Sequence, residues 1–511
     1  MGATRIGEKL GQIGSGEDML NILDIAIIVL YFVGMVFLGL YAQKKQKSVD
    51  DYYVGGRTMG AFKLGALWMA GWIGGSAVIG TTSNGYSMGV TAIWYVTAIA
   101  GGCIIFALIM AKPIKRISSV LNNITFPELI ASRYDSKNGV MCSITTILAM
   151  IGYTAAQFVA GASILNVLTG WNLGVCYVVA AVVIICYVST GGLLAVTYTD
   201  IVQMLLLVLG VVVIAVPLIG GTLSSNGLSL TADLPAGYFD LGAWGWPTII
   251  AMVLSTILSF FTSMDSFTRC IAAKDAKSAK LGTIYAAIAV MIIAGAGAYL
   301  GMAGKLLLPD SQSPNNILAE LVVTFFPYGL KGLILIGVLS AIMSTADISV
   351  LTGSASLTKD IIQRFFIPKA SEKQLLRLGL VSSLLIGALG GIFGWFNQDI
   401  MNILLITFTI NSAGLFLPTV GAFFWKRSCA SGAFVSMVSA TIIAIVWYIG
   451  GSVSDIAIFQ IDALWPSFGV SAVLYFAVCL THRQTPEELE KAELFFAARG
   501  KGGADTETAD T

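Results

Sequence analysis

A stripe of hydroxyl and carboxyl side chains interrupts one otherwise apolar stretch of the chain. Within residues 339–349, Ala341, Ser344 and Thr345 are spaced i, i+3, i+4, and Asp347 follows Ser344 by about one helical turn. On a helix such residues share a face. Hydroxyl, carboxylate and backbone carbonyl oxygens are hard ligands that alkali and alkaline-earth cations prefer, and ionisable groups at membrane depth mark ion or solute paths. The spacing therefore predicts a cation site.

The elements that must position this stripe are membrane helices. The chain has 511 residues, a mean hydropathy of +0.84 and only 11% charged residues, which is too apolar for a soluble protein of this size. We predict an all-α membrane protein with about thirteen transmembrane helices, because stretches of roughly 20 apolar residues recur along it. The predicted spans are 23–41, 62–89, 91–111, 139–168, 173–189, 198–220, 247–267, 281–306, 328–355, 375–396, 399–424, 430–450 and 463–481.

The basic residues predict the orientation of these spans. If the N-terminus lies outside, only Arg5, Lys9, Lys305 and Lys331 of the 29 Lys and Arg residues remain outside. The positive-inside rule then gives an extracytoplasmic N-terminus and a cytoplasmic C-terminus. The expected parts are an extracytoplasmic segment (1–22), a transmembrane transporter domain (23–481) and a cytoplasmic tail (482–511). Within the tail, 487–496 is a short amphipathic run, and we expect disorder after it.

Two of the spans carry interruptions. Gly71, Gly74 and Gly75 precede Ser76 in the second span and favour a helix break near the membrane midplane, and residues 262–269 are polar at the end of the seventh span. The two segments are five spans apart and therefore run in opposite directions. This spacing is typical of two inverted five-helix repeats, here about 62–220 and 247–424, with extra helices at 23–41, 430–450 and 463–481.

Enzymatic functions fit the sequence poorly. The chain has a single histidine, His482, at the end of the last span, and residues 301–305 (Gly-Met-Ala-Gly-Lys) lack the spacing and hydroxyl of an ATP-binding P-loop. A net charge of +1 gives no reason to expect nucleic acid as a partner. The expected partners are the lipid bilayer and a small solute, and the expected energy source is an ion gradient. No cofactor is expected beyond the coupling ion.

Asp200 is a second candidate cation ligand. It follows Tyr198 and Thr199 at the entry of the sixth span, where a carboxylate could simply cap a helix N-terminus. Capping leaves Asp347 unexplained, whereas cation binding accounts for both carboxylates. Both readings stay open.

The chain resembles the sodium:solute symporter family, which includes proline, sugar, pantothenate, sialic acid and choline carriers. The resemblance spans about residues 22–480. It rests on the joint order of these motifs: Gly191-Gly192-Leu193 with Tyr198-Thr199-Asp200, Arg269 before Ala272-Ala273-Lys274, and Met343-Ser344-Thr345. It implies a LeuT-like fold of five plus five inverted helices, in agreement with the topology above.

The resemblance also implies site residues. The sodium site of the family would here use the carbonyls of Ala70, Ile73 and Ala341 and the hydroxyls of Ser344 and Thr345. A second cation site, found in some members, would use Asp200 and Ser344; Asp347 could contribute a carboxylate. Proton coupling through Asp347 is the rival interpretation.

The solute pocket is expected between the break in span 62–89, span 91–111, the end of span 247–267 and span 399–424. Asp265 could face an ammonium group of the solute or pair with Arg269. The candidate solute-binding residues are Gly74, Gly75, Ser76, Trp94, Asp265 and Asn411.

We therefore predict a secondary active transporter of the plasma or inner membrane, which couples inward sodium movement to uptake of a small polar organic solute by alternating access. A proton-coupled carrier and a transporter-like solute sensor are the alternatives. The solute is expected to be an amino acid, an organic cation or a monocarboxylate, in that order. The sequence leaves the oligomeric state open.

Overall fold

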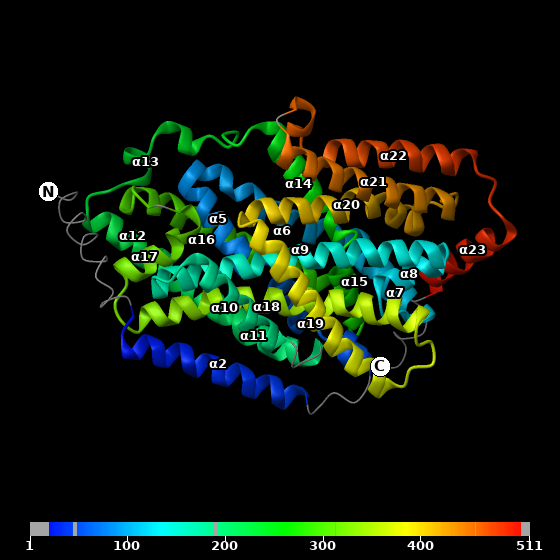
Figure 1. Ribbon diagram of the computed structural model, residues 1–511, viewed down its shortest axis with the longest axis horizontal. Coiled ribbons are helices and arrows are strands. Elements are labelled where there is room, and N and C mark those ends of the chain that lie inside the picture. Colours follow the sequence, from blue (N-terminus) through cyan, green and yellow to red (C-terminus); the bar gives the residue numbers. More distant parts are fainter. Residues whose placement is uncertain (1–19, 44–48, 189–192, 312, 455, 502–511) are drawn as a thin grey trace, which may run out of the picture.

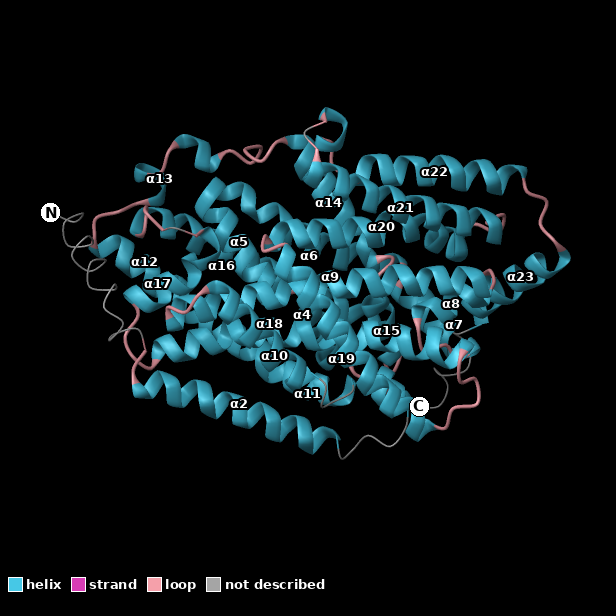
Figure 2. Ribbon diagram, viewed as in Figure 1, coloured by secondary structure: helices cyan, strands magenta, loops and turns pink. Residues whose placement is uncertain are grey.

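The computed structural model describes residues 20–43, 49–188, 193–311, 313–454 and 456–501. These residues form a bundle of helices joined by loops, with one isolated backbone bridge between Met59 and Ala273 (Figures 1 and 2). The prediction of an all-helical protein is confirmed for this part of the chain. The predicted segment 1–22 lies almost wholly outside it.

Among the described residues, the helices of the first half begin at Ile22. They are α2 (Ile22–Gln43), α3 (Val49–Val54), α4 (Ala61–Trp72), α5 (Gly75–Met88), α6 (Ile93–Ile109), α7 (Ala111–Leu121), α8 (Phe126–Arg133), α9 (Ser136–Thr169), α10 (Leu173–Val188), α11 (Leu193–Leu207) and α12 (Val216–Ser225). A π-helical stretch, Val208–Ala215, joins α11 to α12, so that the three form one long rod.

The described residues of the second half are also mostly helical. Its helices are α13 (Leu230–Asp233), α14 (Trp246–Phe260), α15 (Met264–Ala272), α16 (Ala276–Leu307), α17 (Ile317–Phe325), α18 (Leu330–Ala355), α19 (Glu372–Phe396), α20 (Ile400–Phe424), α21 (Ala430–Val453), α22 (Leu464–Thr481) and α23 (Pro486–Lys501). A second π-helical stretch, Ser356–Gln363, extends α18.

Ten helices of the described residues are long and apolar enough to cross a membrane, and α2 and α10 contain shorter apolar stretches. Many apolar side chains on their outer faces are exposed, as a lipid-facing surface requires. A multi-helix membrane protein is therefore confirmed, whereas the count of thirteen spans and the orientation remain predictions.

Both predicted breaks are present. Between α4 and α5 the chain leaves helical geometry at Ile73 (φ −109°, ψ 78°) and Gly74 (φ −80°, ψ 173°). Between α14 and α15 the helix stops at Phe260 and restarts at Met264. The first break follows from dense glycine, which lowers helical stability.

Helix α18 lies in the middle of the bundle (Figure 1). It continues to Gln363, and 89% of the apolar stretch within Leu330–Gln363 is buried inside the protein. It packs against α9, α11 and α19 and also touches α4 and α5 around the first break. Its polar residues are therefore surrounded by protein rather than lipid.

The first turn of α18 is held by Asp24 of α2. The buried Asp24 carboxylate accepts hydrogen bonds from the N–H groups of Gly329 (2.8 Å) and Gly332 (2.7 Å). A Cβ at Gly332 would lie 2.9 Å from the Asp24 backbone, so the contact requires glycine there. A carboxylate at a helix N-terminus satisfies free N–H groups and complements the helix dipole.

The tail is more ordered than expected. Residues 497–501 continue helix α23 beyond the predicted amphipathic run, and 502–511 lie outside the described residues. Phe495 is buried, and the Arg499 guanidinium donates to the Phe423 carbonyl (2.6 Å). The helix packs on α7 and α8, so burial of its apolar face provides the order that composition alone did not predict.

Candidate functional site

The stripe on α18 meets the break between α4 and α5. The Thr345 hydroxyl donates to the Ala70 carbonyl (2.6 Å), and the Ser344 hydroxyl lies within hydrogen-bond reach of the carbonyls of Ala70 (3.4 Å) and Ala341 (3.1 Å). Ile73, three residues after Ala70, is the C-cap of α4. The two side chains and the break predicted from the sequence are thus brought together, and all are buried.

Gly74 and Gly75 permit this close approach. A Cβ at Gly74 would lie 2.7 Å from both Thr345 Oγ1 and Gln157 Oε1, and one at Gly75 would overlap Ile342. Both glycines thus face α18 and α9, and neither lines the cavity described below. The side chain of Ser76 lies outside the described part of the structure.

Asp200 on α11 and Asp347 on α18 form a buried acidic pair. Their exposed fractions are 0% and 2%, and they are close enough for their charges to interact. Both carboxylate oxygens of Asp200 are buried and have no hydrogen-bond partner among the described residues. Asp200 does not cap its helix at the first turn, since α11 begins at Leu193. Two carboxylates that share a buried site favour a bound cation or a proton.

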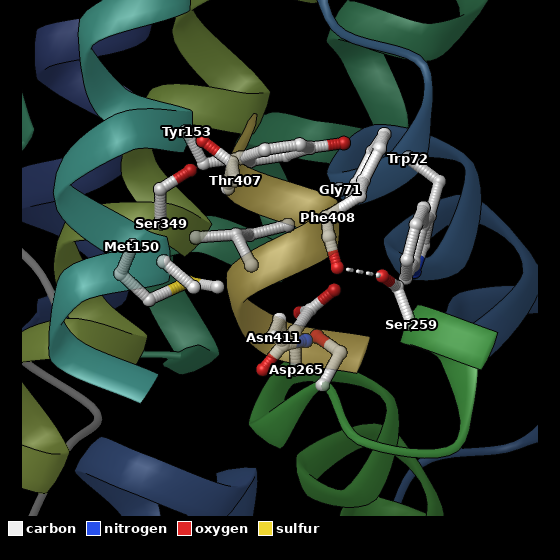
Figure 3. A pocket seen from close by; sticks show the side chains of 13 residues that line it. Gly71, Trp72, Met150, Tyr153, Ser259, Asp265, Ser349, Thr407, Phe408 and Asn411 are labelled. Carbon is white, nitrogen blue, oxygen red and sulfur yellow. Dashed lines mark hydrogen bonds between the residues drawn. The ribbon is translucent and has the colours of Figure 1, made fainter. Parts of the chain in front are cut away.

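A small cavity lies beside the break, with about 20 Å³ of space for the centre of a water molecule, and residues of six helices and one linker meet in it (Figure 3). Its walls come from α4, α9, α14, the α14–α15 linker, α15, α18 and α20. The lining residues are Gly71, Trp72, Ala149, Met150, Tyr153, Ser259, Ser263, Asp265, Ile348, Ser349, Thr407, Phe408 and Asn411. We call it the central cavity.

Aromatic rings form one wall of the central cavity. Trp72 stacks on Phe260 with centroids 3.7 Å apart and 12° between the ring planes, and Phe408 lies 5.9 Å from Trp72. Ser259 donates to the Phe408 carbonyl (3.2 Å), which fixes α14 against α20 (Figure 3).

The polar end of the cavity carries Asp265 and Asn411. Asp265 forms an ion pair with Arg269 one turn later on α15, and Arg269 also donates to the Leu67 carbonyl (2.9 Å). Arg269 is 1% exposed and stays behind the cavity wall, while the Asp265 carboxylate reaches it. The Asn411 side-chain oxygen is buried without a hydrogen-bond partner among the described residues. The cavity therefore presents acceptors to a solute.

Two parts of the predicted pocket fall elsewhere. Trp94 lies at the end of α6, where its indole N–H donates to the Leu241 carbonyl (2.9 Å) and its ring meets Trp246. The predicted span 91–111 supplies no lining residue, although the Tyr95 ring of α6 lies 6.3 Å from the ring of the lining residue Phe408.

Helix α9 takes the place expected for α6. Met150 and Tyr153 line the cavity and Gln157 lies beside Gly74 one turn further along. In the sequence, Tyr153 and Gln157 are four residues apart in an apolar span, and this spacing could have indicated that α9 faces the cavity. Ser349 and Thr407 were also missed, since single hydroxyls in membrane helices commonly bond to their own backbone, as Thr407 does to Ile403 (2.7 Å).

Comparison with known proteins places this geometry in a family. The model of the family described as "Sodium:solute symporter family" matches residues 52–439. A sodium/proline symporter of Haemophilus influenzae is 26% identical, with 91% of this chain and 96% of that protein covered. A sodium/proline symporter of Staphylococcus aureus is 25% identical, with 88% and 91% covered.

Solved structures agree on the fold. A Na⁺-coupled sialic acid symporter in a substrate-bound, outward-open state has a TM-score of 0.74 at 20% identity, with 91% of this chain and 98% of that chain covered. A nucleobase-cation-symport-1 family transporter in a closed conformation has a TM-score of 0.53 at 16% identity, with 88% and 99% covered. The fold is LeuT-like. The chain thus belongs to the sodium:solute symporter family and is a multi-pass, sodium-coupled secondary transporter rather than an enzyme.

Proposed function

We propose that sodium binds between the α4–α5 break and α18, held by the carbonyls of Ala70, Ile73 and Ala341 and the hydroxyls of Ser344 and Thr345. The observation that carries this proposal is the 2.6 Å contact between Thr345 Oγ1 and the Ala70 carbonyl. It brings a buried hydroxyl next to a backbone carbonyl in the last turn of α4, just before the helix break. When sodium binds, each hydroxyl turns a lone pair to the ion instead of donating to the carbonyl.

Sodium at this position would favour the solute site. Trp72 of α4 and Ser349 of α18 line the central cavity, and both lie about one turn from the proposed ligands. An ion that bridges α4 and α18 therefore fixes two cavity walls at once. Because coupling between binding sites is reciprocal, solute should raise the affinity for sodium by the same factor.

The proposed solute is a small molecule with an amino group and a compact apolar body, and an amino acid is the first choice. Asp265 and the Asn411 oxygen, which has no hydrogen-bond partner in the described part of the chain, supply acceptors, and the aromatic wall favours apolar or cationic groups. The two curated relatives above are named for proline transport, which supports an amino acid. An organic cation and a monocarboxylate are the next candidates.

Asp200 and Asp347 support a second candidate role. We infer that the pair holds either a second cation or a proton that moves with the solute. The buried oxygens of Asp200, without partners among the described residues, favour an exchangeable ligand there over a structural role.

A thermal-shift screen tests the proposal first. The purified protein is heated with members of a solute library in sodium or in potassium, and a true solute stabilises the protein more in sodium. The solute is then supplied to proteoliposomes with an inward sodium gradient. Accumulation that follows the sodium gradient at fixed pH supports the proposal. Accumulation that follows only a proton gradient overturns it in favour of proton coupling, and binding without flux in either gradient favours a sensor.

A further inference from the structure

A second cavity, with about 280 Å³ of space for the centres of water-sized molecules, lies against helix α20. It is lined by Asn402 and Thr409 of α20, by Trp447 and Tyr448 of α21, and by Phe459 and Asp462 of the segment that leads into α22, among others. At 100° per residue, Asn402 and Thr409 lie on the face of α20 opposite to Thr407 and Asn411, which line the central cavity. Helix α20 is therefore a wall shared by two cavities. We call the second one the α20–α21 cavity.

The walls of the α20–α21 cavity are held by specific contacts. The Trp447 indole N–H donates to the Ile461 carbonyl (3.0 Å), and its ring meets Phe459 edge-on with centroids 5.2 Å apart. A Cβ at Gly450 would lie 2.7 Å from the Phe459 ring, so glycine lets the 457–460 turn close on α21. Asn397 donates to the Tyr448 hydroxyl (3.0 Å).

The electrostatics of this cavity favour a cation. Asp462 is its only charged lining residue. One Asp462 oxygen accepts from the Leu464 N–H (2.9 Å), and no basic side chain among the described residues forms an ion pair with it. Burial raises the pKa of Asp462 above its usual value, and only that N–H opposes the shift. A cation in the cavity would supply the missing countercharge.

We propose that the α20–α21 cavity binds an organic ammonium group. A carboxylate beside tryptophan, tyrosine and phenylalanine rings is the combination that recognises such a group, since the ring faces attract cations. Amides, hydroxyls and aliphatic side chains complete the lining, and about 280 Å³ of water-accessible space leaves room for a small organic cation. A bare alkali ion would leave most of this space unfilled.

The ammonium group has two possible sources. It belongs either to a free solute or to the headgroup of a lipid, because the exposed apolar side chains of Val453, Ile456 and Ile461 lie around the same segment. The central cavity also combines aromatic rings with one carboxylate, but there Arg269 already pairs with Asp265. The α20–α21 cavity therefore offers the less compensated charge, and the proposal does not depend on the identity of the transported solute.

The test is binding of tetramethylammonium to the full chain in nanodiscs of phosphatidylglycerol, measured by titration calorimetry. Asp462→Asn keeps the oxygen that caps Leu464 but removes the charge, and we expect about tenfold weaker binding. Phe459→Leu keeps apolar volume and should weaken binding about threefold. Asp233→Asn is the matched control, because that carboxylate also accepts from a backbone N–H (Ser229, 2.7 Å) but lies outside the cavity, and binding should be unchanged.

Asp265→Asn separates the two cavities. Binding that survives Asp265→Asn and is lost in Asp462→Asn supports the proposal, whereas the reverse pattern places tetramethylammonium in the central cavity and overturns it. Equal binding by Asp462→Asn and the parent protein also overturns it. Phosphatidylcholine added to the nanodiscs identifies the source: weaker tetramethylammonium binding indicates a competing lipid headgroup, and unchanged binding indicates a site for a free ammonium solute.

Discussion

At the scale of single residues, Thr345 is the side chain on which sodium coupling should depend most. Thr345→Ala removes the hydroxyl closest to the Ala70 carbonyl, and we expect the sodium concentration for half-maximal uptake to rise by about 10-fold or more, as for loss of one bond to a charged ligand. Sodium-dependent uptake in proteoliposomes measures this effect.

Two variants control the Thr345 experiment. Thr345→Ser keeps the hydroxyl and should retain most of the sodium affinity. Thr441→Ala removes a hydroxyl that bonds only to its own helix, at the Met437 carbonyl (2.8 Å), and should leave sodium dependence unchanged. If Thr345→Ala has the sodium dependence of the parent protein, the proposed ligand set is wrong.

The buried Asp265–Arg269 ion pair should contribute to the stability of the folded protein. Arg269→Met leaves the Asp265 carboxylate without its partner, and loss of one member of a buried ion pair costs about 3–5 kcal/mol. The double variant Asp265→Asn/Arg269→Met should regain part of the lost thermal stability, because it leaves no uncompensated charge. Melting temperatures in detergent measure both, and a double variant less stable than Arg269→Met would contradict this account.

At the scale of elements, α23 should respond to pH through His482 and Glu488. The hydrogen bond to Glu488 (3.0 Å) raises the pKa of His482 above 6.5. Burial alone would raise the pKa of Glu488, but hydrogen bonds from the Thr485 N–H and from His482 lower it below 4.5. The contribution of His482 to the stability of docked α23 is complete below pH 6.5 and is lost as pH rises through the pKa of His482 in the folded protein. The glutamate contribution is complete above pH 4.5 and is lost as pH falls through its folded pKa.

We therefore expect α23 to dock most firmly between pH 4.5 and 6.5 and to loosen as pH rises further. Hydrogen exchange of residues 486–501, corrected for the intrinsic effect of pH, measures the docking. His482→Gln should abolish the change above pH 6.5 and leave protection of α9 unaltered. A change that persists in His482→Gln would assign it to another group.

The sequence predicted some elements better than others, for physical reasons. The break at Ile73 and Gly74 was predictable because glycine density acts locally, and the α18 stripe was predictable because helical spacing fixes its face. The placement of α9 against the cavity was not, since it depends on which helices pack together. The residues around Tyr153 in the sequence are like those around an aromatic residue that faces lipid or packs between helices. Only the packing of the helices shows that Tyr153 lines the cavity.

At the scale of the whole molecule, the orientation is the main untested prediction. With thirteen spans and the basic residues in the cytoplasm, green fluorescent protein fused after residue 511 should fluoresce, and alkaline phosphatase fused at the same place should be inactive. The converse pattern would mean that the count is off by one or that the chain is inverted. A fusion at residue 455, between α21 and α22, should give the opposite readout and serves as the internal control.

The hydrogen bonds between the Asp24 carboxylate and the start of α18 constrain when this contact can form during synthesis of the chain. Its partners are more than 300 residues apart in the chain: 305 separate Asp24 from Gly329. At ribosomal speeds of 5–20 residues per second, α2 must wait roughly 15 to 60 s in the bilayer before its acceptor is synthesised. During that interval the Asp24 carboxylate has its local bond from the Asn21 N–H (3.2 Å) but lacks both donors of α18, so the nascent protein needs water or an insertion factor beside Asp24. The proposed sodium-binding helix is thus anchored by a helix that is synthesised more than 300 residues earlier, and this contact cannot form until the start of α18 has been made.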